Sequence, residues 1–362
     1  MAGDILAGMP SDVSDHPASP TLQFITEVIE PRRDEIQLWR DVKKHQDILL
    51  EDAQKRRRTT AVKLGSGFLL KREGQRIGGL DAGVTTLVSG HALQSTQSLE
   101  VCHAHLHASE VPTVSGRSFH VSDRSGAEAY RSAQGSVLTV RPGTYLGKPV
   151  ISLPVSSALE LDREWERAGA ALARLKSARQ QIYLENFSDD LSLRVFVVGE
   201  DVVAAIARVP FYLVGDGMAS VDKLVESERK RRAACENLSQ RFPAINADHL
   251  GSMGVTADQV LNAGEVRTLP AEPHGAAGGG VNVDIFDELS DELKGLAIDA
   301  MWAFPGLNAT AVDIRTPALD SAAGARVADV IPQANLSEFT YPAYGEPRRC
   351  GVRMIDHMIL GR

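Results

Sequence analysis

The chain has 362 residues, of which 43% are hydrophobic and 24% are charged, and its formal net charge at pH 7 is −8. These values are typical of a globular protein with two or three subdomains, and the acidic balance argues against a general nucleic-acid surface. No apolar run reaches the length of a membrane span, and the N-terminus lacks the basic start and apolar core of a signal peptide. Cys102, Cys235 and Cys350 are far apart and odd in number, which predicts a reducing compartment, with the cytoplasm as the expected location.

The first quarter of the chain predicts a leader, helices and short strands. Residues 1–20 are rich in Ser, Pro, Asp and Gly, and we expect a disordered leader there. A charged helical pattern covers residues 22–58, and Pro31 should divide it into two helices. The basic run at residues 55–58 could contact an anion, although such a run at a helix end usually lies on a solvated face. Glycines then separate short strands between residues 60 and 90.

A predicted helix over residues 94–108 carries one cysteine and three histidines. Cys102, His103, His105 and His107 are residue types that bind zinc. On a helix, however, His103 and His107 share a face while His105 points elsewhere, and no second cluster supplies further ligands. The pattern therefore favours a packing helix with partly exposed histidines over a zinc site.

The most informative stretch is residues 191–209, LSLRVFVVGEDVVAAIARV. Two apolar runs rich in β-branched residues flank a short polar turn at residues 199–201, which predicts a tight antiparallel hairpin. Glu185, Arg194 and Arg208 interrupt an otherwise apolar region. Because burying an unpaired charge is costly, these residues belong either on a solvated edge or around a charged ligand.

Further elements follow on both sides of this hairpin. The segment SVLTVRPGTYLGKPVIS at residues 136–152 predicts a strand, a glycine-containing loop and a second strand, and backbone N–H groups in such a loop can bind phosphate. The remaining predicted elements are helices over residues 156–180, 217–237 and 288–303, a helical insertion over residues 239–264 and a strand over residues 307–314.

Several motifs, in this order, resemble the ATP-grasp superfamily, in particular the branch of cyanophycin synthetase and related amino-acid ligases. The motifs are YLENF at residues 183–187, the Arg-bearing hairpin, ARVP at 207–210, GDG at 215–217 and YPAYGEPR at 341–348. The resemblance covers roughly residues 99–348 and implies an α+β fold in which two lobes clasp a nucleotide. It implies a divergent N-terminal domain at residues 21–93, a small lobe with its leading helix at 94–180, and the central hairpin with the C-terminal lobe at 181–362.

The resemblance implies ATP as a cofactor, and it places the nucleotide-binding residues in the small lobe and at the hinge: Arg141, Gly143, Gly147, Lys148, Glu185 and Phe187. Arg141 stands where the family usually has lysine, so the charge is kept while the donor geometry changes. Glu185 would accept hydrogen bonds from the ribose hydroxyl groups.

The resemblance assigns catalytic roles to two arginines and two glycines. Arg194 and Arg208 would hold phosphate or an acyl phosphate, and the alternative is that they are structural ion-pair partners. Gly279 and Gly280 end a glycine-rich segment that positions the amine in relatives, and a flexible linker is the alternative.

The resemblance also implies a Mg²⁺ site at Asp313, in the sequence VDI. Magnesium prefers hard oxygen ligands, usually one or two carboxylates with phosphate oxygens, so a second protein ligand is required. An ungapped alignment places Asp329 and Ile331 at the two other family positions, whereas a shifted register places Gln333 and Asn335 there. Both alignments remain open, and each gives a weaker site than the family pattern.

The implied activity is that of an ATP-dependent carboxylate–amine ligase, which forms a peptide or amide bond through an acyl phosphate. Its substrates would be amino acids or a short peptide, with no nucleic-acid or membrane partner and with a homo-oligomer allowed. A second hypothesis is a degenerate ATP-grasp protein that binds nucleotide or a partner without turnover, since Arg141, Ile331 and the glycine-rich segment depart from the family pattern. A third, an unrelated nucleotide-binding oxidoreductase, lacks a G-x-G-x-x-G fingerprint.

Overall fold

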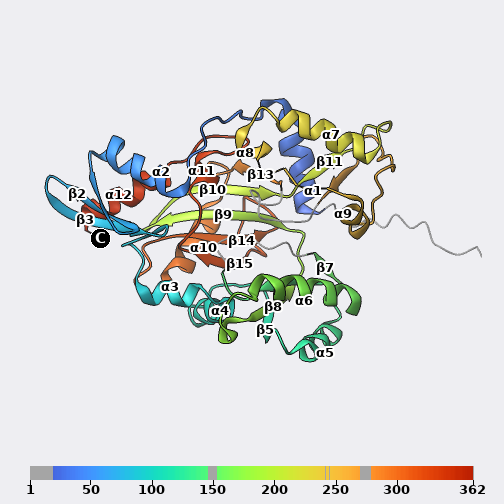
Figure 1. Cartoon of the computed structure of the whole chain (residues 1–362), viewed down its shortest axis with the longest axis horizontal. Coiled ribbons are helices and arrows are strands. Elements are labelled where there is room, and N and C mark those ends of the chain that lie inside the picture. The colour runs from blue at the N-terminus through green and yellow to red at the C-terminus, as the bar shows by residue number, and fades with distance from the viewer. Residues whose placement is uncertain (1–18, 146–152, 241, 244, 270–278, 362) are drawn as a thin grey trace, which may run out of the picture.

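The computed structural model describes residues 19–145, 153–240, 242–243, 245–269 and 279–361, with three smaller sheets arranged around one central sheet (Figure 1). The described helices are α1 (Pro20–Phe24), η1 (Ile25–Ile29), η2 (Glu30–Glu35), α2 (His45–Glu51), η3 (Asp52–Arg56), α3 (Gly90–Thr96), α4 (Leu99–Ala108), α5 (Arg124–Gln134), α6 (Ala158–Leu172), η4 (Ser177–Arg179), α7 (Val221–Arg232), α8 (Glu236–Ser239), α9 (Ala247–Ser252), α10 (Asp291–Trp302), α11 (Ser337–Thr340) and α12 (Cys350–Leu360). The described strands are β1 (Thr60–Leu64), β2 (Gly67–Arg72), β3 (Gln75–Asp81), β4 (Val84–Thr85), β5 (Gly116–His120), β6 (Leu138–Pro142), β7 (Pro154–Val155), β8 (Gln181–Asn186), β9 (Leu191–Val198), β10 (Asp201–Val209), β11 (Tyr212–Val214), β12 (Val266–Thr268), β13 (Val281–Asp284), β14 (Ala309–Thr316) and β15 (Arg326–Ile331).

The central sheet has the order β13-β10-β9-β14-β15, and its neighbouring strands are all antiparallel. β9 and β10 form the predicted hairpin, whose turn uses Gly199 with a φ of 62°. β9 lies in the middle of the sheet, and each of its residues is buried. The alternative of a solvated edge is therefore wrong, because Arg194 and Arg208 lie inside the fold.

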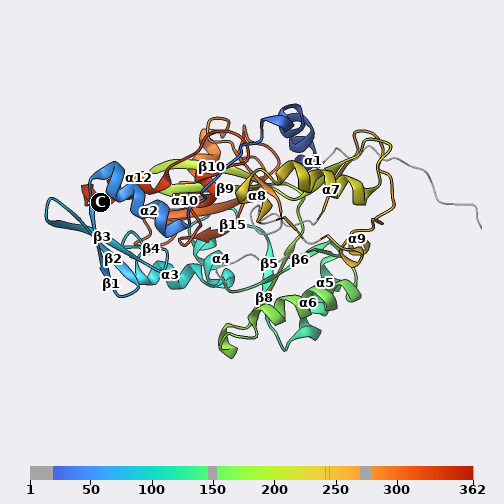
Figure 2. The ribbon, with the colours of Figure 1, turned by 45° about the horizontal axis from the view of Figure 1, so that its top comes forward.

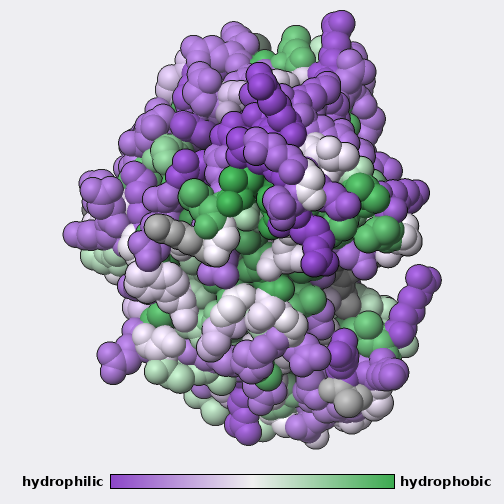
Figure 3. Space-filling model, turned by 90° about the vertical axis from the view of Figure 1, so that its left-hand side faces the viewer, coloured by the Kyte–Doolittle hydropathy of each residue, from purple (hydrophilic) through white to green (hydrophobic). Residues whose placement is uncertain are grey.

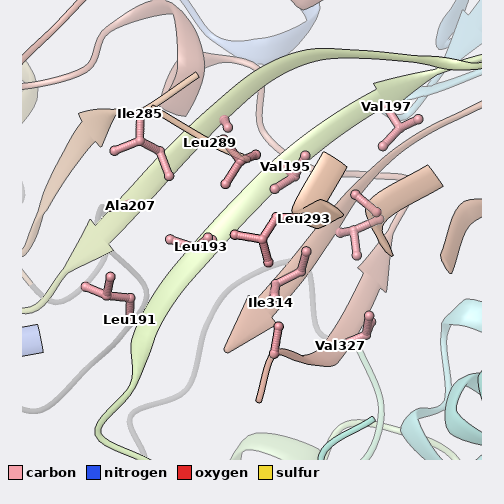
Figure 4. Close-up of a cluster of buried hydrophobic side chains, with 14 of the residues drawn as sticks. Leu191, Leu193, Val195, Val197, Ala207, Ile285, Leu289, Leu293, Ile314 and Val327 are labelled. Atoms are coloured by element: carbon pink, nitrogen blue, oxygen red, sulfur yellow. The ribbon is translucent and has the colours of Figure 1, made fainter. Parts of the chain in front are cut away.

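One face of the central sheet is an apolar core. Because side chains alternate along a strand, Leu191, Leu193, Val195 and Val197 of β9 share this face. They pack with Leu293 of α10, as the close-up shows (Figure 4). The N-terminal helices α1 and η1 add side chains to the same core.

The opposite face of the central sheet changes character along the strands. Near the hairpin turn it is apolar, and Phe196 and Ile206 belong to a core shared with Met354 of α12. Further along, the same face carries the buried side chains of Arg194 and Arg208. One face thus holds both a hydrophobic core and a charged region.

The second sheet has the order β5-β8-β6-β7 and is covered by α5 and α6. It forms a separate layer below the central sheet in both ribbon views (Figure 1 and Figure 2). Its own core includes Val140, Trp165 and Leu184. α6 begins with a capping box between Ser157 and Glu160, which confirms the start of the helix predicted over residues 156–180.

The N-terminal region confirms the predicted strands and the two predicted helical segments, with a kink next to Pro31 and the gap between the segments at residues 36–44. Helical elements cover residues 20–35 and again 45–56, and inside η2 the backbone of Arg32, next to Pro31, departs from helical geometry with φ −118° and ψ 26°. Pro31 lies at the start of η2, where a missing N–H group is tolerated. β2, β3 and α2 share a core with α12, so the domain boundary at residue 93 remains a prediction. Residues 1–18 of the predicted leader lie outside the described residues.

The later predictions differ in accuracy. The helices predicted over residues 94–108, 217–237 and 288–303 and the strand over 307–314 correspond to α3 with α4, α7, α10 and β14. The helical insertion predicted over residues 239–264 is largely wrong, because α9 is its one described helix. Turns and loops with backbone hydrogen bonds fill most of the remainder, around Thr256 and Gly264.

The surface at the end of the molecule that carries β2 and β3 is mostly hydrophilic, with a group of hydrophobic side chains near its centre (Figure 3). Large apolar side chains exposed elsewhere along the chain include Leu159 of α6 and Met218. No described helix is both long enough and apolar enough to cross a membrane.

We expect Leu193→Ala to lower the free energy of unfolding by about 2–5 kcal/mol, because Leu193 is fully buried in the apolar core and its removal leaves a cavity. Leu159→Ala makes the same chemical change at a side chain that is 79% exposed, and it should change this free energy by less than about 0.5 kcal/mol. Denaturant unfolding of the two variants checks the difference. Equal losses would contradict the assigned core.

Candidate functional site

Charged side chains of the central sheet form a row across three strands. Arg194 of β9 is the Cα partner of Asp313 of β14, and Asp313 is the partner of Asp329 of β15. The next row toward the hairpin turn is apolar, with Phe196, Ala311 and Ile331 in register. The sheet register therefore places two carboxylates side by side, bordered by a hydrophobic row.

Asp313 is held by two arginines. Arg194 donates from Nε and Nη2 to the two carboxylate oxygens of Asp313 at 2.8 and 2.9 Å, and from Nη1 to Glu338 of α11 at 3.0 Å. Arg208 of β10 also approaches Asp313, with its Nη2 atom 2.9 Å from Oδ2. Asp313 is only 3% exposed, so these contacts compensate the cost of burying its charge.

Arg141 joins the two sheets. From β6 of the second sheet, Arg141 donates to Glu185 of β8 at 3.1 Å. It also donates through Nη2 to Asp329 of the central sheet at 3.1 Å. Glu185 and Asp329 are both buried. Burial by itself lowers the pKa of Arg141, but these two carboxylates more than offset that effect and raise it.

Asp329 and Arg208 have shifted pKa values whose largest cause is burial. Burial raises the pKa of Asp329 to about 6; the charge of Arg141 opposes this shift in part, and the nearby charge of Asp313 adds to it. Burial, together with the charge of Arg194, lowers the pKa of Arg208 to about 10, while Asp313 acts in the opposite direction. A dense group of buried charges with opposed shifts is typical of functional sites.

A cavity of about 320 Å³ lies between the two sheets, next to this cluster. Its walls come from both sheets, from the residues that connect β8 to β9, and from α1; they include Arg141, Glu185, Asp190, Ser192, Arg208, Arg315 and Thr21. The Thr21 hydroxyl donates to the backbone carbonyl of Asp190 at 3.1 Å, so α1 is attached beside the cavity. The volume is at the lower end of small-molecule pockets, which measure about 300–1,000 Å³.

The side chains present supply part of a site for a divalent metal, but not a complete set of ligands. Asp313 and Asp329 supply hard oxygen atoms on adjacent strands, the arrangement expected for magnesium with phosphate oxygens. Both carboxylates are engaged by arginines, and Ile331 presents an apolar side chain in the neighbouring row. Within the described residues, no group of three or more His, Cys, Asp or Glu side chains could hold a metal ion by itself.

The other predicted site residues are spread over several places. Phe187 lines the cavity, whereas Asn335 accepts a hydrogen bond from the Ser337 N–H at 3.0 Å at the start of α11. Gly143 donates its N–H to the Gln181 carbonyl of β8, in the second sheet. Gly147 and Lys148 lie outside the described residues. The roles assigned to all of these residues remain predictions.

Gly279 and Gly280, which follow the undescribed residues 270–278, are both buried. Gly279 has a φ of 76°, and a side chain there would collide with Pro243. Arg232, which is fully buried, donates to the Gly279 carbonyl. These contacts fix the backbone at the end of the glycine-rich segment.

The histidines of α4 make separate protein contacts. His103 is hydrogen-bonded to the Tyr183 hydroxyl at 2.7 Å and to the Ala328 carbonyl, while His105 stacks on Phe304. His107 contacts the Thr113 hydroxyl. This agrees with the predicted packing helix.

Two residues of the site were not predicted from the sequence. Glu338 lies in the four-residue helix α11, which has no clear periodic signal, and Arg315 lies two residues after Asp313 on β14. The alternation of side chains along a strand places Arg315 on the same face as Asp313. That alternation is the signal that could have identified Arg315.

We expect the difference in stability between Asp329→Asn and the wild type to depend on pH. Because the pKa of folded Asp329 is raised to about 6, above its unfolded value of about 3.9, the folded state retains a proton that the unfolded state has lost. Wild-type stability should therefore fall with rising pH between about pH 4 and pH 6, relative to the variant, by an amount of the order of 2 kcal/mol. Denaturant unfolding at several pH values in the presence of a chelator measures this difference. A constant difference across that pH range would contradict the shift.

Comparisons with known proteins find relatives in sequence and in fold. Cyanophycin synthetase from Geminocystis herdmanii is 24% identical over 256 residues, which cover 68% of this chain and 28% of that protein. The glutathione biosynthesis bifunctional protein GshAB from Desulfotalea psychrophila is 22% identical over 256 residues, which cover 69% of this chain and 32% of that protein. The chain thus spans about a third of the length of these curated relatives.

The solved structure of a bifunctional glutathione synthetase from Pasteurella multocida superimposes with a TM-score of 0.57 at 18% identity, covering 88% of this chain and 44% of that one. No family model matches the chain. The structural similarity and the matches to these synthetases confirm the predicted α+β architecture, and the chain has the ATP-grasp fold.

Proposed function

We propose that this protein is an ATP-dependent carboxylate–amine ligase that forms a peptide or amide bond through an acyl phosphate. The observation that carries the proposal is the cluster of buried arginines and carboxylates beside a cavity between the two sheets of an ATP-grasp fold. Phosphoryl transfer is catalysed by positioning and by charge neutralisation, and these side chains are suited to both tasks. The names of the relatives, cyanophycin synthetase and glutathione biosynthesis protein, support this reaction class.

The proposed reaction has two balanced steps. An oxygen of the substrate carboxylate attacks the terminal phosphorus of ATP, the bond to the bridging oxygen breaks, and ADP leaves with that electron pair. The amine nitrogen of the second substrate then attacks the carbonyl carbon of the acyl phosphate, inorganic phosphate leaves, and the nitrogen loses a proton. Negative charge that develops on phosphoryl oxygens in both steps needs donors fixed in advance.

The residues of the site divide these tasks in the proposal. Arg141 and Glu185, at the junction of the two sheets, would contact the nucleotide, while Arg194 and Arg208 would orient and neutralise phosphoryl oxygens. Asp313, with Asp329 beside it, would hold Mg²⁺, which when bound supplies further neutralisation of the phosphate charge. Arginines now paired with carboxylates would exchange those partners for phosphate oxygens of similar charge.

We propose amino acids or a short peptide as substrates, and the cytoplasm as the location. The free and buried state of Cys102, Cys235 and Cys350 is consistent with a reducing compartment.

One observation favours a second candidate, a protein that binds nucleotide without turnover. Asp313 and Asp329 are both engaged by arginines, and the apolar side chain of Ile331 lies in the adjoining row. A metal site with two carboxylates would be weaker than one with a third oxygen ligand. Nucleotide could still bind through the arginines.

Incubation with ATP, Mg²⁺ and pairs of amino acids, followed by ADP measurement and mass spectrometry, separates the two candidates. A ligase gives ADP together with a product whose mass equals that of the two amino acids minus water. Stabilisation by ATP without ADP release supports the second candidate. If ATP neither binds nor is consumed, both candidates are contradicted.

We expect Asp313→Asn to lower the rate of ADP release at least about a hundredfold, because the variant loses an anionic metal ligand close to the transferred phosphoryl group. Asp291→Asn at a fully exposed position makes the same chemical change and should leave the rate unchanged. Circular dichroism and thermal unfolding show whether each variant is folded. Full ADP release by folded Asp313→Asn would contradict the metal assignment.

A further inference from the structure

A row of three polar residues faces the cavity from neighbouring strands of the central sheet. Arg315 of β14 is the Cα partner of Ser192 of β9, and Arg208 of β10 donates from Nη2 to the Ser192 hydroxyl at 3.1 Å. All three residues line the cavity. We call Arg208, Ser192 and Arg315 the cationic row; it lies next to the row that contains Arg194 and Asp313.

Arg315 differs from the other arginines of the site. Arg141, Arg194 and Arg208 each form an ion pair with a carboxylate. For Arg315, by contrast, the part of the chain that the structure describes provides neither a hydrogen-bond acceptor nor an ion-pair partner. A guanidinium group is thus exposed to the cavity while the rest of the site is paired.

The surroundings of Arg315 favour an anionic ligand. Burial lowers the pKa of Arg315, and the neighbouring charges of Glu185, Asp313 and Asp190 oppose this effect without pairing with it. Glu185 is paired with Arg141 and Asp313 with Arg194, while Asp190, which also lines the cavity, accepts a hydrogen bond from the Ser188 hydroxyl. Because none of these carboxylates contacts Arg315, a molecule in the cavity can supply the acceptor that this buried guanidinium group lacks among the described residues.

A phosphoryl group matches the cationic row better than a single carboxylate does. Its oxygens can accept from more than one guanidinium group and from a hydroxyl at the same time, and the planar fork of arginine suits this geometry. A carboxylate has two oxygens and a single charge, so it would leave donors of the row unused.

We propose that Arg315, together with Ser192 and Arg208, binds a phosphoryl group of the nucleotide in this cavity. The proposal rests on the proposed function, which places an adenine nucleotide there. It makes Arg315 a ligand-binding residue on β14, two positions beyond Asp313 and on the same face of the sheet. The same strand would then contribute both a metal-binding carboxylate and a phosphate-binding cation.

Calorimetric titration of the wild type and Arg315→Gln with adenosine, AMP, ADP and ATP tests the proposal without requiring the second substrate. We expect the variant to bind adenosine as the wild type does, and to lose about tenfold to a hundredfold in affinity for phosphate-bearing ligands. The shortest ligand that shows the loss identifies the phosphoryl group. Arg315→Lys keeps the charge without the fork and should recover part of the affinity.

Arg326→Gln is a matched control, because Arg326 is the Cα partner of Arg315 on β15, is exposed and does not line the cavity. Its nucleotide affinities should equal those of the wild type. Unchanged affinity of Arg315→Gln for all four ligands would overturn this inference and leave the proposed function standing. An equal loss of affinity for adenosine would do the same. A wild type that binds none of the four ligands would instead contradict the proposed function.

Discussion

The site depends on the pairing of buried guanidinium groups with buried carboxylates on one face of the central sheet. Arg194 and Asp313 come from adjacent strands and meet through two hydrogen bonds, whereas Arg141 reaches Asp329 from the other sheet. None of these charges would be tolerated in the interior without its partner. The same contacts therefore hold the two sheets together and place a concentrated set of charges beside the cavity.

The apolar parts of the fold make this pairing possible. The first face of the central sheet packs on α10, and the opposite face is closed near the hairpin turn by α12, so the strands are held rigidly at both places. Rigid strands keep the register that sets Asp313 opposite Asp329. The charged cluster lies on the part of the sheet that neither core covers, next to the cavity.

Local patterns allowed much of the fold to be predicted from the sequence, because they depend on residues close together in the chain. The hairpin of β9 and β10 follows from two apolar runs, rich in β-branched residues, that flank the turn at Gly199. Pro31 marks a kink at Arg32, as expected, but the gap between the two helical segments lies further along the chain, at residues 36–44. For the site, resemblance to ATP-grasp proteins singled out Arg194 and Asp313, but their pairing is a property of strand register. Glu338 was not predicted because it reaches Arg194 from a distant short helix.

The central claim is that the cavity between the two sheets holds a nucleotide whose phosphates approach the arginines and Asp313. A crystal structure with a non-hydrolysable ATP analogue and Mg²⁺ tests it most directly. The account predicts the nucleotide between β8 and β14, with the metal on Asp313 and Asp329 and phosphate oxygens on Arg194 or Arg208. A nucleotide bound elsewhere, with Arg194 still engaging both oxygens of Asp313, would contradict it.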